Sequence, residues 1–340
     1  MSPAGRTGSA PALAPLAPVL AAGGAEMLEQ LELLEQRLLG AAAGHGDVIG
    51  HHASSTLAAG GKRLRPLLVL LCGGRSAAGA GDGRLLHAAT AVELLHMATL
   101  VHDDVLDRAT LRRGRPTVVE SGGREVAVAT GDLLLARAFA ELVQSGSAEA
   151  VRALSSASSG LVRGELMQRA DAWSERVTPA RYLERCELKT ARLFEAACRL
   201  GALLGEPGPE RADGLAAFGA RIGVAFQLLD DVLDIAGPTE RTGKPRGADL
   251  LDGTVTLPLI LARGSDPSLA ALDLRAAVTT HAEAERVCDR IAATGALEEA
   301  RRRAFEYVRE AKLSLHELGL DRERVRALEL VAEGVVERYA

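Results

Sequence analysis

Residues 94–107 read LLHMATLVHDDVLD, and residues 224–234 read VAFQLLDDVLD. In both stretches an apolar run ends in the same five letters, DDVLD. Each run belongs to a longer segment that is apolar nearly all round, which is typical of a helix in the middle of a large bundle. The two stretches therefore predict buried helices that each end in a cluster of carboxylates.

A 3.6-residue period continues outward from both stretches, and the good helix formers Ala, Leu, Glu and Arg dominate. The expected helices cover residues 26–39, 84–107, 124–144, 148–171, 178–204, 208–235, 283–293, 296–313 and 321–338. Strand signals are scarce, and the breaks are short segments rich in Gly, Pro or Ser. The sequence therefore predicts an all-α fold, with a single large helical bundle over residues 26–340 after a disordered Ala/Pro-rich tail over residues 1–25.

The composition excludes several classes of protein. A net charge of −5 and 3 % aromatic residues provide neither a basic field nor stacking platforms for nucleic acid. The four cysteines form no CxxC pair, so we expect no zinc site, no disulfides and a reducing, cytoplasmic location. No uninterrupted apolar run reaches the roughly 18 residues of a membrane span.

The repeated DDVLD motif predicts a metal site. Residues i and i+4 share one face of a helix, so Asp103 lies beside Asp107 and Asp230 beside Asp234. Such carboxylates repel each other in an apolar bundle unless a cation neutralises them. Oxygen ligands without His or Cys select Mg²⁺ or Mn²⁺, which complete their shell with water and phosphate oxygens. One copy alone is most often a solvated helix end, but two identical copies indicate a cage for a diphosphate.

Basic residues cluster around both copies. They lie in GGKRLRP (60–66), RRGRPT (112–117), KT (189–190) and GKP (243–245). His96 precedes Asp103 by two helical turns and shares its face. The chain has four lysines among 40 basic residues, and three of them lie in these motifs: Lys62, Lys189 and Lys244. A lysine retained in an Arg-rich chain indicates a place that needs a compact ammonium group.

The order of these motifs closely resembles that of the trans-isoprenyl diphosphate synthases, the polyprenyl synthetase family, from about residue 30 to the C-terminus. The resemblance implies an all-α bundle around a deep central cavity, working as a homodimer with about three Mg²⁺ ions. It also implies two substrates, isopentenyl diphosphate and an allylic diphosphate, which condense head to tail with loss of diphosphate.

The resemblance assigns a role to each matching residue. The residues expected to bind the diphosphate of isopentenyl diphosphate are Lys62, Arg65, His96 and Arg113. Those expected to bind the allylic diphosphate are Arg112, Lys189 and Lys244. The expected Mg²⁺ ligands are Asp103, Asp107 and Asp230, with Asp234 acting through water.

Three residues are expected to take part in the chemistry itself: Lys189, Thr190 and Gln227. The oxygens of Thr190 and Gln227 would face the developing allylic cation, and Phe226 would lie by the isopentenyl site. The chain departs from the family at Thr254, where a lysine is usual, and this removes one expected charge from the allylic site.

Product length in this family depends on the residues one helical turn before the first Asp motif, here Ala98 and Thr99, roughly 6–8 Å deeper along the helix. Short-chain synthases carry a bulky aromatic residue there. Ala98 leaves the tunnel open and favours a medium or long product, with farnesyl or geranylgeranyl diphosphate as the alternative.

Two further alternatives are a terpene cyclase and a non-catalytic partner subunit. A cyclase usually lacks GGKRLRP and the second Asp motif, whereas partner subunits tend to lose aspartates; this chain keeps all of them.

Overall fold

The computed structural model describes residues 17–23, 25–74, 83–206, 208–237 and 245–337. Within these ranges the strands are confined to one antiparallel pair, β1 (Leu111–Arg112) and β2 (Arg115–Pro116), and helices dominate. The predicted all-α class is confirmed.

The chain divides into two compact units, each assembled from several segments. Unit 1 comprises Met1–Leu154, Ala197–Ala216 and Leu318–Gly334; unit 2 comprises Ser155–Ala196, Ala217–Glu317 and Val335–Ala340. One of the five boundaries, between Glu317 and Leu318, lies in a connection between helices. The other four fall inside α8 (Ala148–Asp171), α10 (Arg192–Leu204), α11 (Ala212–Ala236) and α19 (Arg322–Glu337).

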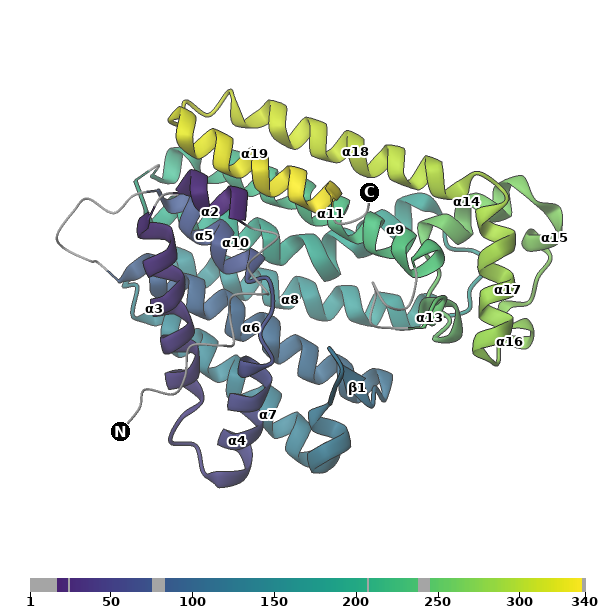
Figure 1. The fold of residues 1–340 in the computed structure, drawn as a ribbon, viewed down its shortest axis with the longest axis horizontal. Coiled ribbons are helices and arrows are strands. Elements are labelled where there is room, and N and C mark those ends of the chain that lie inside the picture. Colours follow the sequence, from purple (N-terminus) through teal and green to yellow (C-terminus); the bar gives the residue numbers. More distant parts are fainter. Residues whose placement is uncertain (1–16, 24, 75–82, 207, 238–244, 338–340) are drawn as a thin grey trace. The chain divides into compact units, whose positions relative to one another are not determined.

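Unit 1 is built around helix α6, which packs against α5 and α7, with α3 also against α6 and α4 against α7 (Figure 1). The helices that lie wholly in this unit are α2 (Ala17–Gly23), α3 (Ala25–Ala42), α4 (Asp47–Ala58), α5 (Leu64–Gly73), α6 (Arg84–Asp107) and α7 (Val118–Val143). A Cβ at Gly131 of α7 would lie 2.2 Å from His102 Nε2 of α6. This glycine therefore permits the close approach of the two helices.

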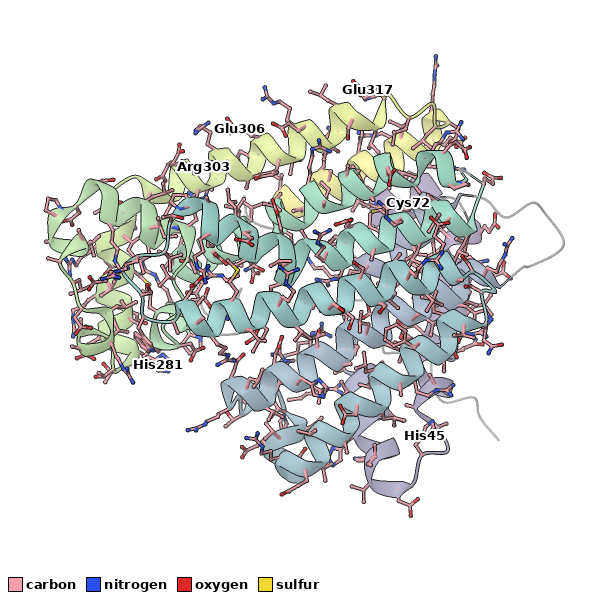
Figure 2. The ribbon with its side chains drawn as sticks, turned by 180° about the vertical axis from the view of Figure 1, so that it is seen from behind. His45, Cys72, His281, Arg303, Glu306 and Glu317 are labelled. Carbon is pink, nitrogen blue, oxygen red and sulfur yellow. The ribbon has the colours of Figure 1, made fainter. Side chains whose placement is uncertain are left out.

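Unit 2 contains α9 (Pro179–Cys186), a π-helical turn η2 (Glu187–Ala191) and most of α8 and α11. Its other helices are α13 (Ala248–Leu251), α14 (Leu257–Ser265), α15 (Pro267–Ala270), α16 (Leu274–Ala277), α17 (His281–Ala292) and α18 (Ala296–Leu315). The half-buried charged side chains of Arg303 and Glu306 lie on the outer side of helix α18 (Figure 2), and Arg303 Nε lies 2.7 Å from Glu299 Oε1. This row of ions identifies a solvated face.

Threonine side chains start several helices. Thr117, Thr178 and Thr280 are the N-caps of α7, α9 and α17, and each hydroxyl accepts a hydrogen bond from a first-turn backbone N–H. Because these N–H groups have no partner within the helix, the caps fix where each helix begins.

The predicted disordered tail over residues 1–25 is wrong for its last part. Ala17–Gly23 form helix α2, which packs against α3 and buries the side chains of Val19 and Leu20. Pro18 falls in the first turn of α2, where proline is tolerated. Residues 1–16 lie outside the described residues.

Two helical segments among the described residues, Arg84–Asp107 and Pro209–Ala236, are long and apolar enough for a membrane span, but 61 % of each apolar window is buried in the protein. This degree of burial is typical of helices in the core of a protein. All four cysteines, including Cys72 (Figure 2), are buried thiols that form no disulfide.

Candidate functional site

The first DDVLD motif ends helix α6. Asp104 is 4 % exposed, Asp103 is half-buried and Asp107 is exposed. Arg108 follows in the left-handed region (φ 51°) and ends the helix. Carboxylates are unfavourable at the C-terminal end of a helix, which carries a partial negative charge. These aspartates therefore do not serve to stabilise α6. Their charges add to the partial negative charge of the helix end, so the position attracts a cation.

The RRGRPT motif folds as a hairpin directly after α6. Leu111 pairs with Pro116 and Arg112 with Arg115. Arg113 (φ 53°) and Gly114 (φ 72°) form the turn, and both adopt the left-handed conformation that a type I′ turn requires. This conformation costs a non-glycine residue about 1–2 kcal/mol, so a predicted binding residue is held in a strained backbone.

Arg112 neutralises the buried middle aspartate of the motif. Its Nε donates to Asp104 Oδ1 at 2.8 Å, and its Nη2 lies 2.7 Å from the same oxygen. The hairpin is thereby tied to the end of α6. Of the two arginines assigned from the sequence, Arg112 is thus engaged with protein and Arg113 is exposed.

In GGKRLRP the middle cation has a structural role. Arg63 is 4 % exposed, and it pairs with Glu35 at 2.6 Å and Glu93 at 2.7 Å. Burial alone would lower the pKa of Arg63, but the hydrogen bonds and charges of these two glutamates outweigh it and raise the pKa. Lys62, on the preceding turn, is half-buried.

Three of the residues predicted to bind isopentenyl diphosphate converge in unit 1. Arg65 Nη1 lies 3.2 Å from His96 Nε2, and a Cβ at Gly61 would lie 3.0 Å from both terminal nitrogens of Arg113. Burial lowers the pKa of Arg65 to about 10. Burial, followed by the positive charges of Arg65 and Arg113, holds the pKa of His96 well below 6.5. These residues form a cationic cluster around a neutral imidazole, an arrangement suited to an anion.

The two residues expected to set product length lie on α6, directly after His96 in this cluster. Ala98 is 1 % exposed, and the Thr99 hydroxyl donates to the His96 carbonyl at 2.8 Å. Because α6 is continuous from Arg84 to Asp107, both small side chains lie about one helical turn before Asp103.

The second DDVLD motif ends helix α11 in unit 2. Asp231 is 3 % exposed, Asp234 is half-buried and Asp230 is exposed. The backbone N–H of Asp249 donates to Asp234 Oδ2 at 3.3 Å. These carboxylates again lie at the negative end of a helix.

A chain of hydrogen bonds joins the second motif to the Lys-Thr pair. The Thr190 hydroxyl donates to Gln227 Oε1, Gln227 Nε2 donates to Asp231 Oδ1, and the Tyr182 hydroxyl donates to Asp231 Oδ2, each at 2.7 Å. Burial, and after it the charge of Asp249, raises the pKa of Asp231 to about 7 against the two hydrogen bonds it accepts. Two of the three predicted catalytic residues are thus in direct contact.

Lys189, the third, lies in the π-helical turn next to Thr190. Its ammonium pairs with Glu165 of α8, whose pKa falls because the charge and hydrogen bond of Lys189 outweigh the effect of burial. A Cβ at Gly164 would lie 2.5 Å from the Lys189 backbone nitrogen, so α8 packs directly on this turn. Phe226 packs against Phe194 with ring centroids 5.6 Å apart.

Two further positions singled out from the sequence, Lys244 and Thr254, contribute no side-chain contact to this description of the site. Lys244 lies outside the described residues. Thr254, the departure from the family pattern, follows a left-handed Gly253 packed on Trp173, and its N–H donates to the Asp249 carbonyl at 2.8 Å.

Comparison with known proteins gives the geometry its context. The family model described as polyprenyl synthetase matches residues 47–294. The chain belongs to the polyprenyl synthetase family. It is accordingly a prenyltransferase of the polyprenyl diphosphate synthase class.

Individual relatives agree with this membership. Heptaprenyl diphosphate synthase component 2 of Geobacillus stearothermophilus is 39 % identical over 88 % of this chain and 92 % of the relative. Geranylgeranyl diphosphate synthase of Methanosarcina mazei is 38 % identical over 76 % of this chain and 80 % of the relative. A polyprenyl synthase from Caulobacter crescentus CB15, solved with calcium and isoprenyl diphosphate, has a TM-score of 0.84 and 34 % identity over 99 % of this chain and 100 % of that one.

The carboxylates fit the divalent metal that the polyprenyl synthetase family implies. No group of three or more His, Cys, Asp or Glu side chains in the described part of the chain could by itself hold a metal ion. Mg²⁺ needs no such cage, because it usually takes one or two carboxylates and completes its shell with water and phosphate oxygens. The pairs Asp103 with Asp107 and Asp230 with Asp234 offer that kind of partial, all-oxygen shell.

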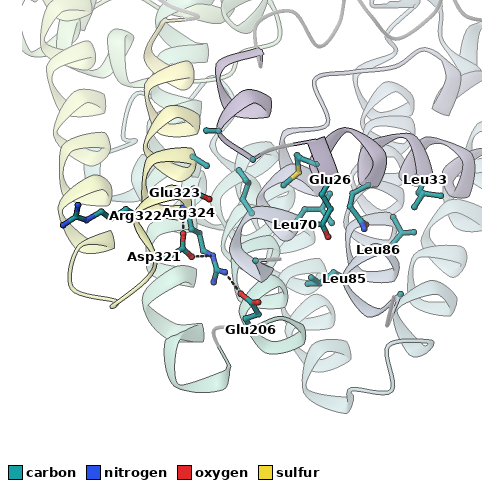
Figure 3. Close-up of a pocket in the computed structure, with 18 residues that line it drawn as sticks. Glu26, Leu33, Leu70, Leu85, Leu86, Glu206, Asp321, Arg322, Glu323 and Arg324 are labelled. Carbon is teal, nitrogen blue, oxygen red and sulfur yellow. Dashed lines mark hydrogen bonds and ion pairs between the residues drawn. The ribbon is translucent and has the colours of Figure 1, made fainter. Parts of the chain in front are cut away.

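A cavity of about 580 Å³ in unit 1 is lined by none of the predicted site residues (Figure 3). Its apolar wall includes Leu70 and Leu86, and its polar rim includes Glu206, which accepts from Arg324 Nη2 at 2.6 Å.

Sequence reasoning missed the partners that hold the site residues: Tyr182, Glu165 and the middle aspartates. One available signal was angular. The middle aspartate of DDVLD is turned by about 100° from the first, so it projects to a different face of the helix. Another was compositional, because Tyr182 is one of only three tyrosines in the chain.

Proposed function

We propose that this prenyltransferase condenses isopentenyl diphosphate head to tail with an allylic diphosphate. In that reaction the C1–O bond of the allylic diphosphate breaks, the isopentenyl alkene forms a new C–C bond to C1, and one proton is lost. Diphosphate leaves and can accept that proton, so the chain need not provide a dedicated base.

The observation that carries the proposal is the convergence of Arg65, His96 and Arg113 in unit 1. Guanidinium groups bind phosphate oxygens through paired, charge-assisted hydrogen bonds. With Lys62 nearby in sequence, this cationic cluster suits the diphosphate of a second substrate. A terpene cyclase has only one diphosphate to bind and no need for a second cationic cluster of this kind.

The chain's other residues have distinct tasks in this proposal. Asp103, Asp107 and Asp230 would hold Mg²⁺, with Asp234 acting through water, and Arg112, Lys189 and Lys244 would bind the allylic diphosphate. Bound Mg²⁺ supplies the positive charge that makes diphosphate a good leaving group. Thr190 and Gln227 would present oxygens to the electron-poor allylic carbon, while the apolar helices exclude water.

The direct test is incubation of the isolated protein with labelled isopentenyl diphosphate and Mg²⁺. Geranyl, farnesyl and geranylgeranyl diphosphates serve as primers in parallel, and chromatography gives the product length. Label in a longer prenyl diphosphate is expected. An unlabelled cyclic hydrocarbon made from the allylic substrate alone would overturn the proposal.

A medium or long product is the second part of the proposal. The small residues Ala98 and Thr99 support it, as does similarity to a relative named for a heptaprenyl product. Ala98→Phe is expected to shorten the main product to about three or four isoprene units, because an aromatic ring one turn below Asp103 fills the space for the growing chain. Ala98→Val is the matched control, with a smaller shift. An unchanged product in Ala98→Phe would show that the chain does not grow past position 98.

Assembly is proposed as a homodimer in the cytoplasm. A second candidate is a two-component enzyme, because a relative at 39 % identity is named component 2 of a heptaprenyl diphosphate synthase. Activity of the isolated protein with a dimeric mass in solution supports the homodimer. Activity only after addition of a second protein supports the two-component assembly.

A further inference from the structure

The chain Thr190–Gln227–Asp231–Tyr182 fixes which atom of the Gln227 amide faces Thr190. An ionised carboxylate can only accept hydrogen bonds, so Asp231 in its ionised form requires the NH₂ group of Gln227. Nε2 lies 2.7 Å from Asp231 Oδ1, and this leaves Oε1 to accept from the Thr190 hydroxyl at 2.7 Å. A flipped amide would place two oxygens against each other at Asp231, which is unfavourable.

Asp231 is itself held in place. Its second oxygen accepts from the Tyr182 hydroxyl at 2.7 Å, and the tyrosine is fully buried. The Arg185 guanidinium lies 5.3 Å from the Tyr182 ring centroid, and its Nη2 donates to the Val255 carbonyl at 2.5 Å. Both oxygens of the carboxylate therefore have fixed partners in the core of unit 2.

The first DDVLD motif has no such arrangement, although its sequence is identical. Gln227 lies four residues before Asp231, one turn away on the same face, whereas Leu100 occupies that position before Asp104. Asp104 is satisfied by Arg112 instead. The hydrogen-bonded glutamine is therefore specific to the second copy and does not follow from burying an aspartate as such.

We propose that Asp231 and Tyr182 are positioning residues that lock the Gln227 amide with its oxygen beside the Thr190 hydroxyl. This inference rests on the proposed function, in which these two oxygens stabilise the allylic cation. An unlocked amide could turn its NH₂ group toward the cation, and the resulting positive dipole would oppose ionisation. Asp231 then acts through Gln227 and not as a metal ligand, in contrast to its neighbour Asp230.

The test compares Tyr182→Phe, Asp231→Asn and the exchanged pair Asp231→Asn/Gln227→Glu. In the exchanged pair, the carboxylate introduced at position 227 accepts from Thr190 through one oxygen and from the NH₂ group introduced at position 231 through the other. The amide oxygen at position 231 still accepts from Tyr182.

Both single variants are expected to lower kcat by about 10–100-fold, as loss of a supporting hydrogen bond does at other sites, with KM for both substrates nearly unchanged. The exchanged pair is expected to recover at least tenfold over Asp231→Asn, because it restores a fixed oxygen beside the Thr190 hydroxyl.

Asp230→Asn is the matched control for metal binding. It is expected to raise the Mg²⁺ concentration needed for half-maximal rate, whereas Asp231→Asn and Tyr182→Phe leave that concentration unchanged. A raised Mg²⁺ requirement in Asp231→Asn, or no recovery in the exchanged pair, would overturn the proposal. Tyr182→Phe removes a single oxygen and keeps the test available if Asp231→Asn does not fold.

One readout is independent of turnover. The side-chain amide protons of Gln227, observed by NMR, are expected to move downfield in the wild type because Nε2 donates to a carboxylate, and to return to ordinary positions in Asp231→Asn. Wild-type protein that elongates no primer but shows this shift refutes the proposed function and retains the lock. An unshifted amide in an active wild type refutes the lock alone.

Discussion

The two DDVLD motifs have identical sequences but opposite surroundings. In unit 1 the buried Asp104 is bound by the Arg112 guanidinium. Nearby, burial and then the positive charges of Arg65 and Arg113 hold the pKa of His96 well below 6.5. In unit 2 the buried Asp231 accepts from two neutral donors, Tyr182 and Gln227, and its pKa is raised to about 7.

The difference shows that a repeated motif need not have a repeated role at every position. In each copy one outer aspartate is half-buried and the other is exposed, and all four lie near the C-terminal end of a helix, where they can serve as metal ligands. The middle aspartates are both buried, yet one compensates a cation of the hairpin and the other orients a glutamine. Variants at equivalent positions should therefore agree for the outer aspartates and disagree for the middle ones.

The largest expected effect concerns what the two copies share. Asp103→Asn and Asp230→Asn should each lower kcat by about 100–1,000-fold, because each removes charge stabilisation of the leaving diphosphate. Chelation of divalent ions should abolish turnover, and added Mg²⁺ should restore it, measured by incorporation of labelled isopentenyl diphosphate. A loss confined to one of the two variants would break the equivalence of the outer aspartates.

The next effect is on the stability of the fold and concerns Asp104, the middle aspartate of the first motif. Arg112→Gln leaves the buried Asp104 carboxylate without its cation and should lower the free energy of unfolding by about 2 kcal/mol, measured with urea. The double variant Arg112→Gln/Asp104→Asn should recover part of that loss, since it buries no uncompensated charge. Equal stability of the single variant and the wild type would contradict the pairing seen here.

Lys189→Arg tests the lysine of unit 2, whose ammonium pairs with Glu165. Activity should fall about tenfold, because a guanidinium cannot replace a compact ammonium group between Glu165 and a diphosphate. Lys312→Arg on helix α18 is the control and should leave the rate unchanged. Wild-type activity in Lys189→Arg would contradict the hypothesis that the few lysines mark places that need a compact ammonium group.

The smallest effect is a pH dependence in unit 1. Unfolded His96 binds a proton below about pH 6.5, while the folded residue, whose pKa is lowered, does not. Wild-type stability should therefore fall as the pH drops below 6.5, by at most about 1.4 kcal/mol per pH unit from this group. His96→Gln should lose less stability than the wild type between pH 7 and about pH 5.5, in urea titrations at both values. Parallel losses would mean that His96 is protonated in the folded chain.

Much of this architecture could be predicted from the sequence because it depends on local pattern. The 3.6-residue period located both ends of α6 and α8 to the residue and those of α11 and α18 to within four residues. The charge pattern singled out both aspartate motifs. The hairpin at Arg113–Gly114 was not predicted, because its turn places an arginine in a conformation that usually requires Asn, Asp or Gly.

The side-chain partners could not be predicted for a different reason. Arg112 reaches Asp104 across a turn that the sequence pattern did not reveal. Tyr182 and Asp231 form a hydrogen bond although they lie 49 positions apart in sequence. Such pairings depend on how helices pack, which periodicity alone does not determine. The roles assigned to the site residues remain predictions that the variants above test.

The π-helical turn at Glu187–Ala191 has a consequence for how such an enzyme can change. The Arg192 N–H donates to the Glu187 carbonyl, five residues back, so this turn contains one residue more than an α-helical turn. It behaves as a one-residue insertion absorbed inside a continuous helix. Deleting a residue here would return an ordinary helix with both flanks in register, and only the aim of Lys189 and Thr190 would change. Evolution could therefore retarget this dipeptide without rebuilding the scaffold that carries it.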